Sequence, residues 1–546
     1  MTSRTASAAL ATVAFAVLAA AGCGRKVPAT TTTAAETAGR LSPTTPAAKG
    51  DTGPVTWATY RDVGTLDPIQ AFDYPENTVI TAMCDSLLQQ QPDGSSKPGL
   101  ATKVETPDPR TIVFTINTGA KFWDGQNVTP ADVVYSLKRN TDPKLAGFYG
   151  AVFESVDSIE ATAGNRVTIK LKQPDNWLLG ELSQMPGIVL EKAYVESEGK
   201  AFGTPSGGTM CTGPFKLKSW RPGSDLTAVR NDAYWDTSLR PMAASMVFKG
   251  APDESSLTSG LLTNEITGFY PQPLTTLGQL KSSTAVTVQT GPSFASDAFV
   301  ITSLTGALKD VRVRQALSMA IDRKAYINAL YGGYGVLPRT LANPGTWGYE
   351  RDVFRKDWNS LPEPTQDVAK AKQLVQQAGA TGKTIVIGTS SEINPLQIEA
   401  EAIRQAALSI GLKAKFKSAS AANFINFFTD ASARKGVDGL VSGSYTDYAD
   451  PAALYKLFAV KGGILNYDDF EDLRISAALE RARTVPDERT RAELTARAGD
   501  LIMQTLPWIP LADPDTIVIM DKRITGAPAS FQYMGGPWAA TIGASG

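Results

Sequence analysis

The chain has 546 residues, which allows about three structural units at roughly 100–200 residues per domain. Its hydrophobic content is 42% and its formal net charge is −1, so the composition is that of a globular protein with no overall field to recruit nucleic acid or acidic lipid. The chain contains no histidine. This excludes Ser-His-Asp and Cys-His nucleophile pairs and His-ligated metals, whereas a Glu or Lys base leaves other enzyme chemistry open.

The first 22 residues predict export. Arg4 supplies a short positive region, and residues 8–21 form an apolar run shorter than the about 20 residues that a membrane-spanning helix needs. The run ends in small residues before Cys23, which resembles a lipobox in which Cys23 carries a lipid. Because Ala20 stands where a Leu is usual, a plain secretory signal cleaved nearby is the alternative. We expect a lipid-anchored protein on the extracytoplasmic face of the cell membrane.

Residues 23–53 are rich in Thr, Ala and Pro and contain almost no large apolar side chains. Such a stretch cannot bury enough surface to fold, so the sequence predicts a disordered tether up to residue 53. From Pro54 onward the pattern is that of a mixed α/β protein.

The predicted elements come from two periodicities. Alternation of apolar and polar residues predicts strands at 55–60, 111–116, 166–171, 384–387, 412–417 and 516–520. Helical spacing of apolar residues predicts helices at 77–89, 313–331, 367–378, 396–410, 470–483 and 487–505. A further helix begins cleanly at Thr129, which suits the N-cap, with Pro130 at the first helical position.

Two cysteines remain besides Cys23. Cys84 and Cys211 form an even pair in an oxidising compartment, which favours a disulfide over two separate buried thiols. The loop that this bond closes is long, so the loop-closure model gives a stabilisation of about 4–5 kcal/mol.

Six segments carry distinctive residues in a fixed order. They are Thr65-Leu66-Asp67-Pro68; Lys121-Phe122-Trp123-Asp124-Gly125 with Thr129-Pro130-Ala131-Asp132; Thr212-Gly213-Pro214-Phe215 with Arg230 to Trp235; Val311 to Leu317 with Ala320 to Arg323; Asp367 to Gly379; and Pro507-Trp508-Ile509-Pro510-Leu511. Together they resemble the family 5 extracellular solute-binding proteins, the receptors of dipeptide and oligopeptide ABC importers. One departure is Cys211, which stands where many members carry Gly.

The resemblance implies an α/β, two-lobed periplasmic-binding-protein-like fold of class C type. Lobe I is expected at 54–99, 205–302 and 507–546, with an extra subdomain at 100–204, and lobe II at 303–506. A two-segment hinge joins the lobes, and the ligand is buried in the cleft between them. The implied partners are a short peptide and the permease subunits of an ABC importer, and the protein is expected to be a monomer without a cofactor.

The loop from Gly443 to Pro451 is the sharpest candidate for the ligand site, because it follows an apolar run of strand type and is rich in Gly, Ser and Tyr. In peptide-binding relatives an Asp at the place of Asp447 pairs with the peptide α-ammonium. The backbone of Gly443 and Tyr445 is expected to run beside an extended peptide, as in strand addition, with Tyr448 nearby. The alternative is that Asp447 is a turn or cap residue and the tyrosines are core.

Weaker candidates are Trp347 in a loop over the cleft, Tyr270 before the first crossover, and Arg339 as a partner for a ligand carboxylate. Trp123 belongs to the most diagnostic segment but is at least equally suited to a core position. For each of these residues a packing or surface role is the alternative.

Two other functions stay open. The same fold can bind a non-peptide solute, such as a metal chelate, haem, an opine, glutathione or an oligosaccharide. From another class, the chain can be an exported hydrolase or a structural cell-wall lipoprotein. A hydrolase needs a nucleophile with its base, and the sequence shows no such pair.

Overall fold

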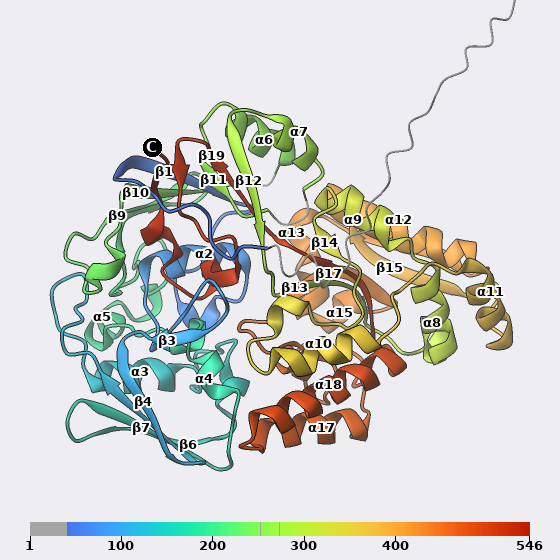
Figure 1. Ribbon diagram of the computed structural model, residues 1–546, viewed down its shortest axis with the longest axis horizontal. Coiled ribbons are helices and arrows are strands. Elements are labelled where there is room, and N and C mark those ends of the chain that lie inside the picture. Colours follow the sequence, from blue (N-terminus) through green and yellow to red (C-terminus); the bar gives the residue numbers. More distant parts are fainter. Residues whose placement is uncertain (1–40, 252, 272–273) are drawn as a thin grey trace, which may run out of the picture.

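The structure is a computed structural model that describes residues 41–546, apart from residues 252, 272 and 273. The predicted signal segment, Cys23 and the tether up to residue 40 lie outside the described residues. Within the described part of the chain, no helix combines the length and the apolar character needed to cross a membrane. The chain forms two lobes, each on its own sheet, and a third, smaller sheet belongs to a subdomain of the first lobe (Figure 1).

The first lobe is built on a seven-stranded mixed sheet of order β12-β19-β11-β1-β10-β9-β8. Its strands are β1 (Thr52–Thr59), β8 (Phe215–Arg221), β9 (Asp225–Arg230), β10 (Ala243–Gly250), β11 (Gly268–Phe269), β12 (Val286–Gly291) and β19 (Thr516–Asp521). The lobe also carries the hairpin β2 (Leu88–Gln90) and β3 (Ser96–Pro98), the pair β20 (Ile524–Thr525) and β21 (Gly543–Ala544), and helices α2 (Tyr74–Met83), α6 (Glu254–Leu262) and α7 (Leu277–Ser282). Its core is aromatic, with the rings of Trp57 and Trp538 4.7 Å apart.

The inserted subdomain carries an antiparallel sheet of order β4-β5-β7-β6. Its strands and helices are β4 (Ala101–Asp108), β5 (Thr111–Ile116), β6 (Val156–Thr162), β7 (Arg166–Leu171), α3 (Pro130–Arg139), α4 (Leu178–Glu181) and α5 (Lys192–Glu198). Helix α3 begins in a capping box, in which Thr129 and Asp132 each accept the other's backbone N–H. At the other end of α3, Arg139 forms a buried ion pair with Asp67 through two hydrogen bonds of 2.9 and 2.8 Å, which fixes the subdomain to the first lobe.

The second lobe is built on a six-stranded sheet of order β14-β18-β13-β17-β15-β16. Its strands are β13 (Ala295–Ile301), β14 (Gly335–Val336), β15 (Thr384–Ser390), β16 (Lys413–Ala419), β17 (Gly439–Tyr445) and β18 (Trp508–Pro514). Its helices are α8 (Val311–Ala320), α9 (Arg323–Tyr331), α10 (Arg351–Ser360), α11 (Val368–Gln377), α12 (Asn394–Ser409), α13 (Ala421–Phe424), α14 (Asn426–Thr429), α15 (Ala431–Arg434), α16 (Pro451–Phe458), α17 (Leu473–Thr484) and α18 (Glu488–Thr505). In Figure 1 this lobe lies on the right, opposite β1 and β10.

Two extended segments connect the sheets, and we call them the hinge: residues 291–295 between β12 and β13, and residues 514–516 between β18 and β19. The strands on either side of the hinge pair with one another, β12 with β19 and β13 with β18. The sequence placed the second lobe at 303–506, but β13 and β18 belong to its sheet, so this range is too narrow at both ends. Both strands are buried apolar runs, and such a run carries no sign of which sheet it joins.

The predicted tether is also too long at its C-terminal end. Residues 41–51 pack on the first lobe, and β1 begins at Thr52. The Thr45 hydroxyl is buried and donates to the Ala527 carbonyl at 2.8 Å, and the Thr525 hydroxyl donates to the Pro46 carbonyl at 2.7 Å. Hydrogen bonds from Thr to a distant part of the chain give order to a segment that lacks apolar side chains.

Most local predictions agree with the structure. The strands at 111–116 and 166–171 have the predicted bounds. The helix predicted over 313–331 is two helices, because Asp322 caps α9 and interrupts the run. The helix predicted over 77–89 ends at Met83, and Leu88 begins a short strand.

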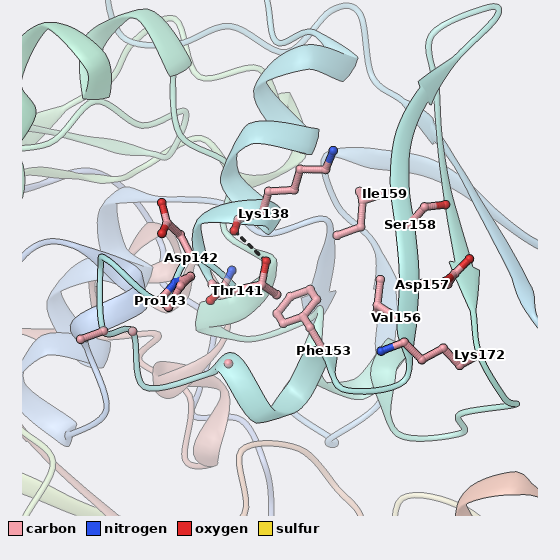
Figure 2. Close-up of a pocket in the computed structure, with 14 residues that line it drawn as sticks. Lys138, Thr141, Asp142, Pro143, Phe153, Val156, Asp157, Ser158, Ile159 and Lys172 are labelled. Carbon is pink, nitrogen blue, oxygen red and sulfur yellow. Dashed lines mark hydrogen bonds between the residues drawn. The ribbon is translucent and has the colours of Figure 1, made fainter.

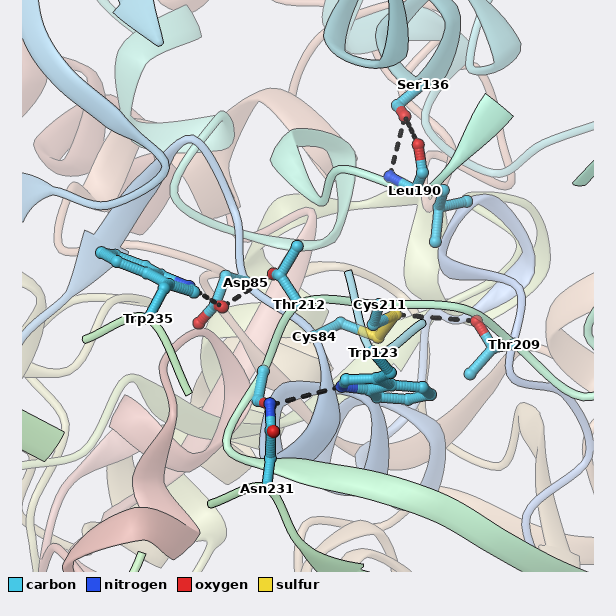
Figure 3. Close-up of a disulfide and its surroundings, with 11 residues drawn as sticks. Cys84, Asp85, Trp123, Ser136, Leu190, Thr209, Cys211, Thr212, Asn231 and Trp235 are labelled. Atoms are coloured by element: carbon cyan, nitrogen blue, oxygen red, sulfur yellow. Dashed lines mark hydrogen bonds between the residues drawn. A yellow bond between two sulfur atoms is a disulfide. The ribbon is translucent and has the colours of Figure 1, made fainter. Parts of the chain in front are cut away.

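Cys84 and Cys211 form a disulfide, as predicted, with 4.9 Å between their Cα atoms (Figure 3). Asp85 lies beside it and is buried. Its carboxylate accepts hydrogen bonds from the Thr212 hydroxyl and the Trp235 indole, both at 2.8 Å, and burial raises the pKa of Asp85. The disulfide and this network hold the turn at residues 211–214 against the end of α2.

Candidate functional site

Strand β17 leads to the predicted binding loop and is paired on one side only near that loop. It pairs with β13 along its whole length, from Gly439 to Tyr445. On its other side β15 pairs with it only at Gly439 and Leu440. Within the described residues, no strand therefore lies beside residues 441–445 on that side.

The backbone groups on the unpaired side belong to Gly443 and Tyr445. The Thr446 N–H donates to the Phe294 carbonyl, so the even-numbered residues of β17 direct their backbone groups to β13. The direction alternates along an antiparallel ladder, and Gly443 and Tyr445 therefore direct theirs to the opposite side. Gly443 is exposed. This edge of β17 is free to accept an extended chain as a further strand.

Asp447 lies two residues beyond the end of β17 and is half-buried. Burial raises the pKa of its carboxyl to about 7; the Glu181 carboxylate raises this pKa further, and the Lys456 ammonium lowers it. Burial also raises the pKa of Tyr149 and of Tyr445 well above the usual range, and Asp447 adds to both shifts. Glu181 and Tyr149 belong to the inserted subdomain, so Asp447 stands where the two lobes meet.

Tyr445 itself spans the boundary between the lobes. Its hydroxyl donates to the Phe72 carbonyl of the first lobe at 2.9 Å. Its ring lies 4.8 Å from the ring of Tyr74 and 5.6 Å from that of Phe531, both of the first lobe. The end of β17 is therefore enclosed by aromatic side chains from across the boundary.

A second contact between the lobes lies close by, and we call it the clasp: residues 173–181 of the inserted subdomain with the residues of α16 and α17 that they touch. Asp175 and Arg483 form an ion pair at 2.8 Å, and both side chains are largely buried. The Asn176 side-chain amide donates to the Ala482 carbonyl at 3.0 Å, and the Asn176 N–H donates to the Arg483 carbonyl at 2.9 Å. In Figure 1 the clasp lies where α4 faces α17.

The centre of the clasp is Trp177. Only 7% of it is exposed, and it packs in the core of the second lobe with Tyr448 although it comes from the other lobe. The Lys456 ammonium and the Arg483 guanidinium each lie 5.3 Å from its ring centre, a cation–π arrangement. Lys456 also forms a buried ion pair with Glu181.

Tyr448, a predicted ligand contact, belongs to this same packing. It is buried against Gly180 so closely that a Cβ on that glycine would lie 2.4 Å from the tyrosine ring. Its hydroxyl has no hydrogen-bond partner within the described residues, and burial raises its pKa well above the usual range. The structure therefore assigns Tyr448 a contact between the lobes, next to Asp447.

The structure does not bring three other predicted ligand contacts to Asp447. Tyr270 is buried in the core of the first lobe, stacked on Tyr533 with ring centres 3.9 Å apart. Trp347 packs beside Phe354 of α10. Arg339 donates to two carbonyls at the end of α10. A single sequence cannot distinguish such packing residues from cleft residues, because both are aromatic or basic residues near loops.

Two further residues of the predicted motifs have structural roles. Trp123 donates its indole N–H to the Gly213 carbonyl beside the disulfide, at 3.3 Å (Figure 3). Asp450 caps α16, where it accepts the Ala452 N–H at 2.9 Å, and it forms a buried ion pair with Arg491. Asp450 therefore begins the helix that carries Lys456.

A hollow of about 550 Å³ lies elsewhere, on the surface of the inserted subdomain between the end of α3 and β6 (Figure 2). The Thr141 hydroxyl in it donates to the Lys138 carbonyl at 3.0 Å. The charged ends of Lys138, Asp142 and Asp157 point away from one another (Figure 2). Its polar groups do not converge, so the boundary at Asp447 is the better candidate.

The groups at the boundary suit binding. They supply an unpaired strand edge, a carboxylate and aromatic walls. In the part of the chain that the structure describes, no group of three or more Cys, Asp or Glu residues is arranged to hold a metal ion. The sequence predicts Asp447 and Tyr445 as ligand contacts, and both lie at this boundary, but it does not predict that Trp177, Glu181 and Lys456 lie there as well. The one local sign of such a contact is Trp177, an aromatic residue that follows a polar turn at residues 173–176.

Comparison with known proteins agrees with this arrangement. The model of the bacterial extracellular solute-binding proteins, family 5, matches residues 96–466. The dipeptide-binding protein of Escherichia coli K12 is 28% identical over 464 residues, which cover 79% of this chain and 83% of that protein. The glutathione-binding protein GsiB of the same organism is 24% identical over 473 residues, which cover 85% and 89%.

Solved structures share the fold. The periplasmic binding protein DppA of Helicobacter pylori, in complex with the peptide STSA, superposes with a TM-score of 0.78 at 22% identity and covers 91% of this chain and 99% of that one. An unliganded open form of the murein tripeptide binding protein MppA superposes with a TM-score of 0.69 at 22% identity, covering 92% and 99%. The family match spans well over half of the sequence, and this chain belongs to the family 5 bacterial extracellular solute-binding proteins.

Proposed function

We propose that the protein captures short peptides between its lobes and delivers them to the permease of an ABC importer. The observation that carries this proposal is the unpaired edge of β17, which ends beside Asp447. An extended peptide adds to that edge through backbone hydrogen bonds of Gly443 and Tyr445. Its α-ammonium then pairs with the Asp447 carboxylate, whose charge is costly to bury without a partner.

The named relatives support this proposal. A dipeptide-binding protein and a complex with a four-residue peptide are among them. The unliganded open form of MppA supports a cycle in which this chain opens at the hinge and closes on its ligand. The chemistry of the cycle is non-covalent, so we propose no enzymatic activity.

The membrane attachment is part of the proposal. A lipid on Cys23 holds the protein, as a monomer, at the extracytoplasmic face of the membrane. Labelling with radioactive palmitate in wild-type and C23A cells tests this. Label that survives in C23A, or that never appears in the wild type, contradicts a lipid at this position.

Mass spectrometry of the molecules that co-purify with the protein tests the ligand class. Peptides are the expected result. A metal chelate, haem, an opine or an oligosaccharide would overturn the proposal. Glutathione, which carries an ammonium group, would narrow the ligand to that one peptide.

Calorimetric titration then tests the anchor. We expect D447N to weaken binding of free-amine peptides by about tenfold or more, because the ammonium loses its buried counter-charge. D357N is the matched control, since burial also raises the pKa of Asp357 to about 6 but this residue lies on α10, outside the clasp. Unchanged affinity in D447N, or an equal loss in D357N, would contradict the anchor.

A further inference from the structure

Three charged groups meet at the boundary, and they come from both lobes. Asp447 and Lys456 belong to the second lobe, nine residues apart, whereas Glu181 belongs to the inserted subdomain of the first. Lys456 forms its ion pair with Glu181, whose side chain is 4% exposed. Within the described residues no ion pair joins Lys456 to Asp447, although the lysine is close enough to lower the pKa of Asp447.

The charges in this cluster do not balance. Two carboxylates share one ammonium, which leaves a charge of −1 next to the edge of β17. Two neighbouring ion pairs are already complete, Asp175 with Arg483 in the clasp and Asp450 with Arg491 beside it. A buried carboxylate without a counter-charge is costly, so in the closed protein Asp447 either takes up a proton, as its raised pKa indicates, or pairs with a further cation.

The pairing depends on closure. Glu181 reaches Lys456 only when the inserted subdomain lies against the second lobe. When the lobes separate, Lys456 stays with Asp447 on the second lobe and loses Glu181. On its own lobe, Asp447 is a carboxylate close enough for Lys456 to lower its pKa, and it is the one that we assign to the ligand.

We propose that Glu181 and Lys456 determine the charge specificity of the site: closure transfers Lys456 from Asp447 to Glu181, and the ligand ammonium takes the place of the lysine. The inference rests on the proposed function. It makes Glu181 a specificity residue although it lies across the boundary from the peptide edge. A ligand without a cation cannot close the protein without leaving Asp447 unpaired.

The experiment measures one ratio, the affinity for trialanine divided by the affinity for N-acetyl-trialanine, by calorimetric titration of the full-length protein. Any cost of weakening the clasp falls on both peptides equally and cancels in this ratio. In E181Q, Lys456 stays with Asp447 and the cluster becomes neutral. We expect the ratio to fall by about tenfold or more, because the ammonium no longer meets an unpaired carboxylate.

The double variant E181Q/K456M returns the cluster to −1, and the ratio is expected to rise again toward the wild-type value. K456M alone leaves two carboxylates unpaired, and its ratio must not fall. D175N is the control, since it removes another ion pair of the clasp; it should weaken both peptides alike and leave the ratio unchanged.

Two failures are distinguishable. If the wild type binds neither peptide, the proposed peptide function fails, and if it binds both equally, the pairing of the ligand ammonium with Asp447 fails. If the wild type prefers trialanine and E181Q keeps that preference, or the double variant does not exceed E181Q, only the role of Glu181 and Lys456 is overturned. Circular dichroism of each variant checks folding, and K456M provides an independent test from the other partner.

Discussion

The hinge and the clasp join the two lobes by different chemistry. At the hinge the chain itself crosses twice, and paired strands on both sides form backbone ladders. At the clasp no chain crosses, and the contact consists of side chains and a few hydrogen bonds from residues 173–181. The hinge ladders lie within one lobe or the other and survive a rotation, whereas every contact of the clasp is lost when the lobes part.

The clasp carries a polar group that is costly to bury. The indole N–H of Trp177 is buried and has no acceptor within the described residues. An unmet buried donor costs about 1–3 kcal/mol. This cost opposes closure, and the free energy of ligand binding helps to offset it.

The largest expected effect follows from removing Trp177. W177A takes a buried indole out of the second lobe only in the closed state, and we expect peptide affinity to fall by about 2–4 kcal/mol. Small-angle scattering should show a larger radius of gyration with peptide present than for the wild type. The variant W177F keeps an aromatic ring but leaves a cavity, because Phe is smaller than Trp, so it should bind more weakly than the wild type and more tightly than W177A. Binding by W177F no better than that of W177A would contradict the role that we assign to the buried ring.

A substitution at the hinge should have the opposite effect, a loss of folding stability with little change in peptide affinity. The buried amide of Asn343 donates to the Ala295 and Pro514 carbonyls, both at 3.1 Å, and so ties the two crossing segments together. We expect N343A to lower the free energy of unfolding by about 1–3 kcal/mol, because two buried carbonyls lose their donor. Peptide affinity should stay within about twofold, a change worth less than half a kcal/mol. A large loss of affinity with unchanged stability would show that the hinge takes part in closure energetics.

The pH dependence of binding gives a smaller effect. Because the pKa of Asp447 is raised to about 7, its carboxyl is protonated below that pH and cannot pair with an ammonium. Affinity should therefore fall by up to about tenfold per pH unit below 7, and fall again above about 8, where the peptide amine loses its proton. The Asp447 carboxyl is faced by Glu181, Lys456, Tyr149 and Tyr445. Calorimetry from pH 5 to about pH 9 measures the peptide affinity that results from all of these groups.

The variant D447N should lose the acid limb of this profile. Without ligand, the same raised pKa costs folding stability as pH rises from the ordinary value of 3.8 to about 7, because the folded protein holds a proton that the unfolded chain has released. An acid limb that persists in D447N would assign the titration to another group.

The smallest effect belongs to the exposed rim of the clasp. Gln173 donates to Glu480 at 2.7 Å, and the pair lies in solvent. We expect Q173A to change peptide affinity by at most about 0.5 kcal/mol, as for other exposed polar pairs. A change as large as that of W177A would mean that the rim, and not the buried indole, holds the lobes together.

The sequence predicts the local elements well where one signal is enough. Alternation gave the bounds of β5 and β7, and the capping residue Thr129 begins its helix as expected. Prediction from sequence fails where the structure depends on packing against distant residues. Helical spacing continues past Met83, because Leu87 and Leu88 are apolar as buried residues outside the helix. The pattern of β13 suits a strand of either lobe equally well.

In the candidate site, too, a local pattern predicts some residues, whereas distant packing brings in the others. Asp447 and Tyr445 belong to a local motif, and a loop after an apolar strand indicates a site. Glu181 and Trp177 reach that loop from some 270 residues earlier in the chain, through a subdomain whose position no local pattern encodes. A single sequence cannot reveal a pairing between such distant segments.

The place where the chain enters the first lobe has a mechanical consequence. Thr45 and Pro46 are bonded to Ala527 and Thr525, so the segment that leads toward Cys23 leaves from the first lobe, next to the C-terminal end of the chain. With a lipid on Cys23, the tether would attach the protein to the membrane through the first lobe and its inserted subdomain. The second lobe, which carries Asp447, would then be joined to the membrane only through the hinge. Closure would bring Asp447 and its bound ligand toward the lobe that the tether holds.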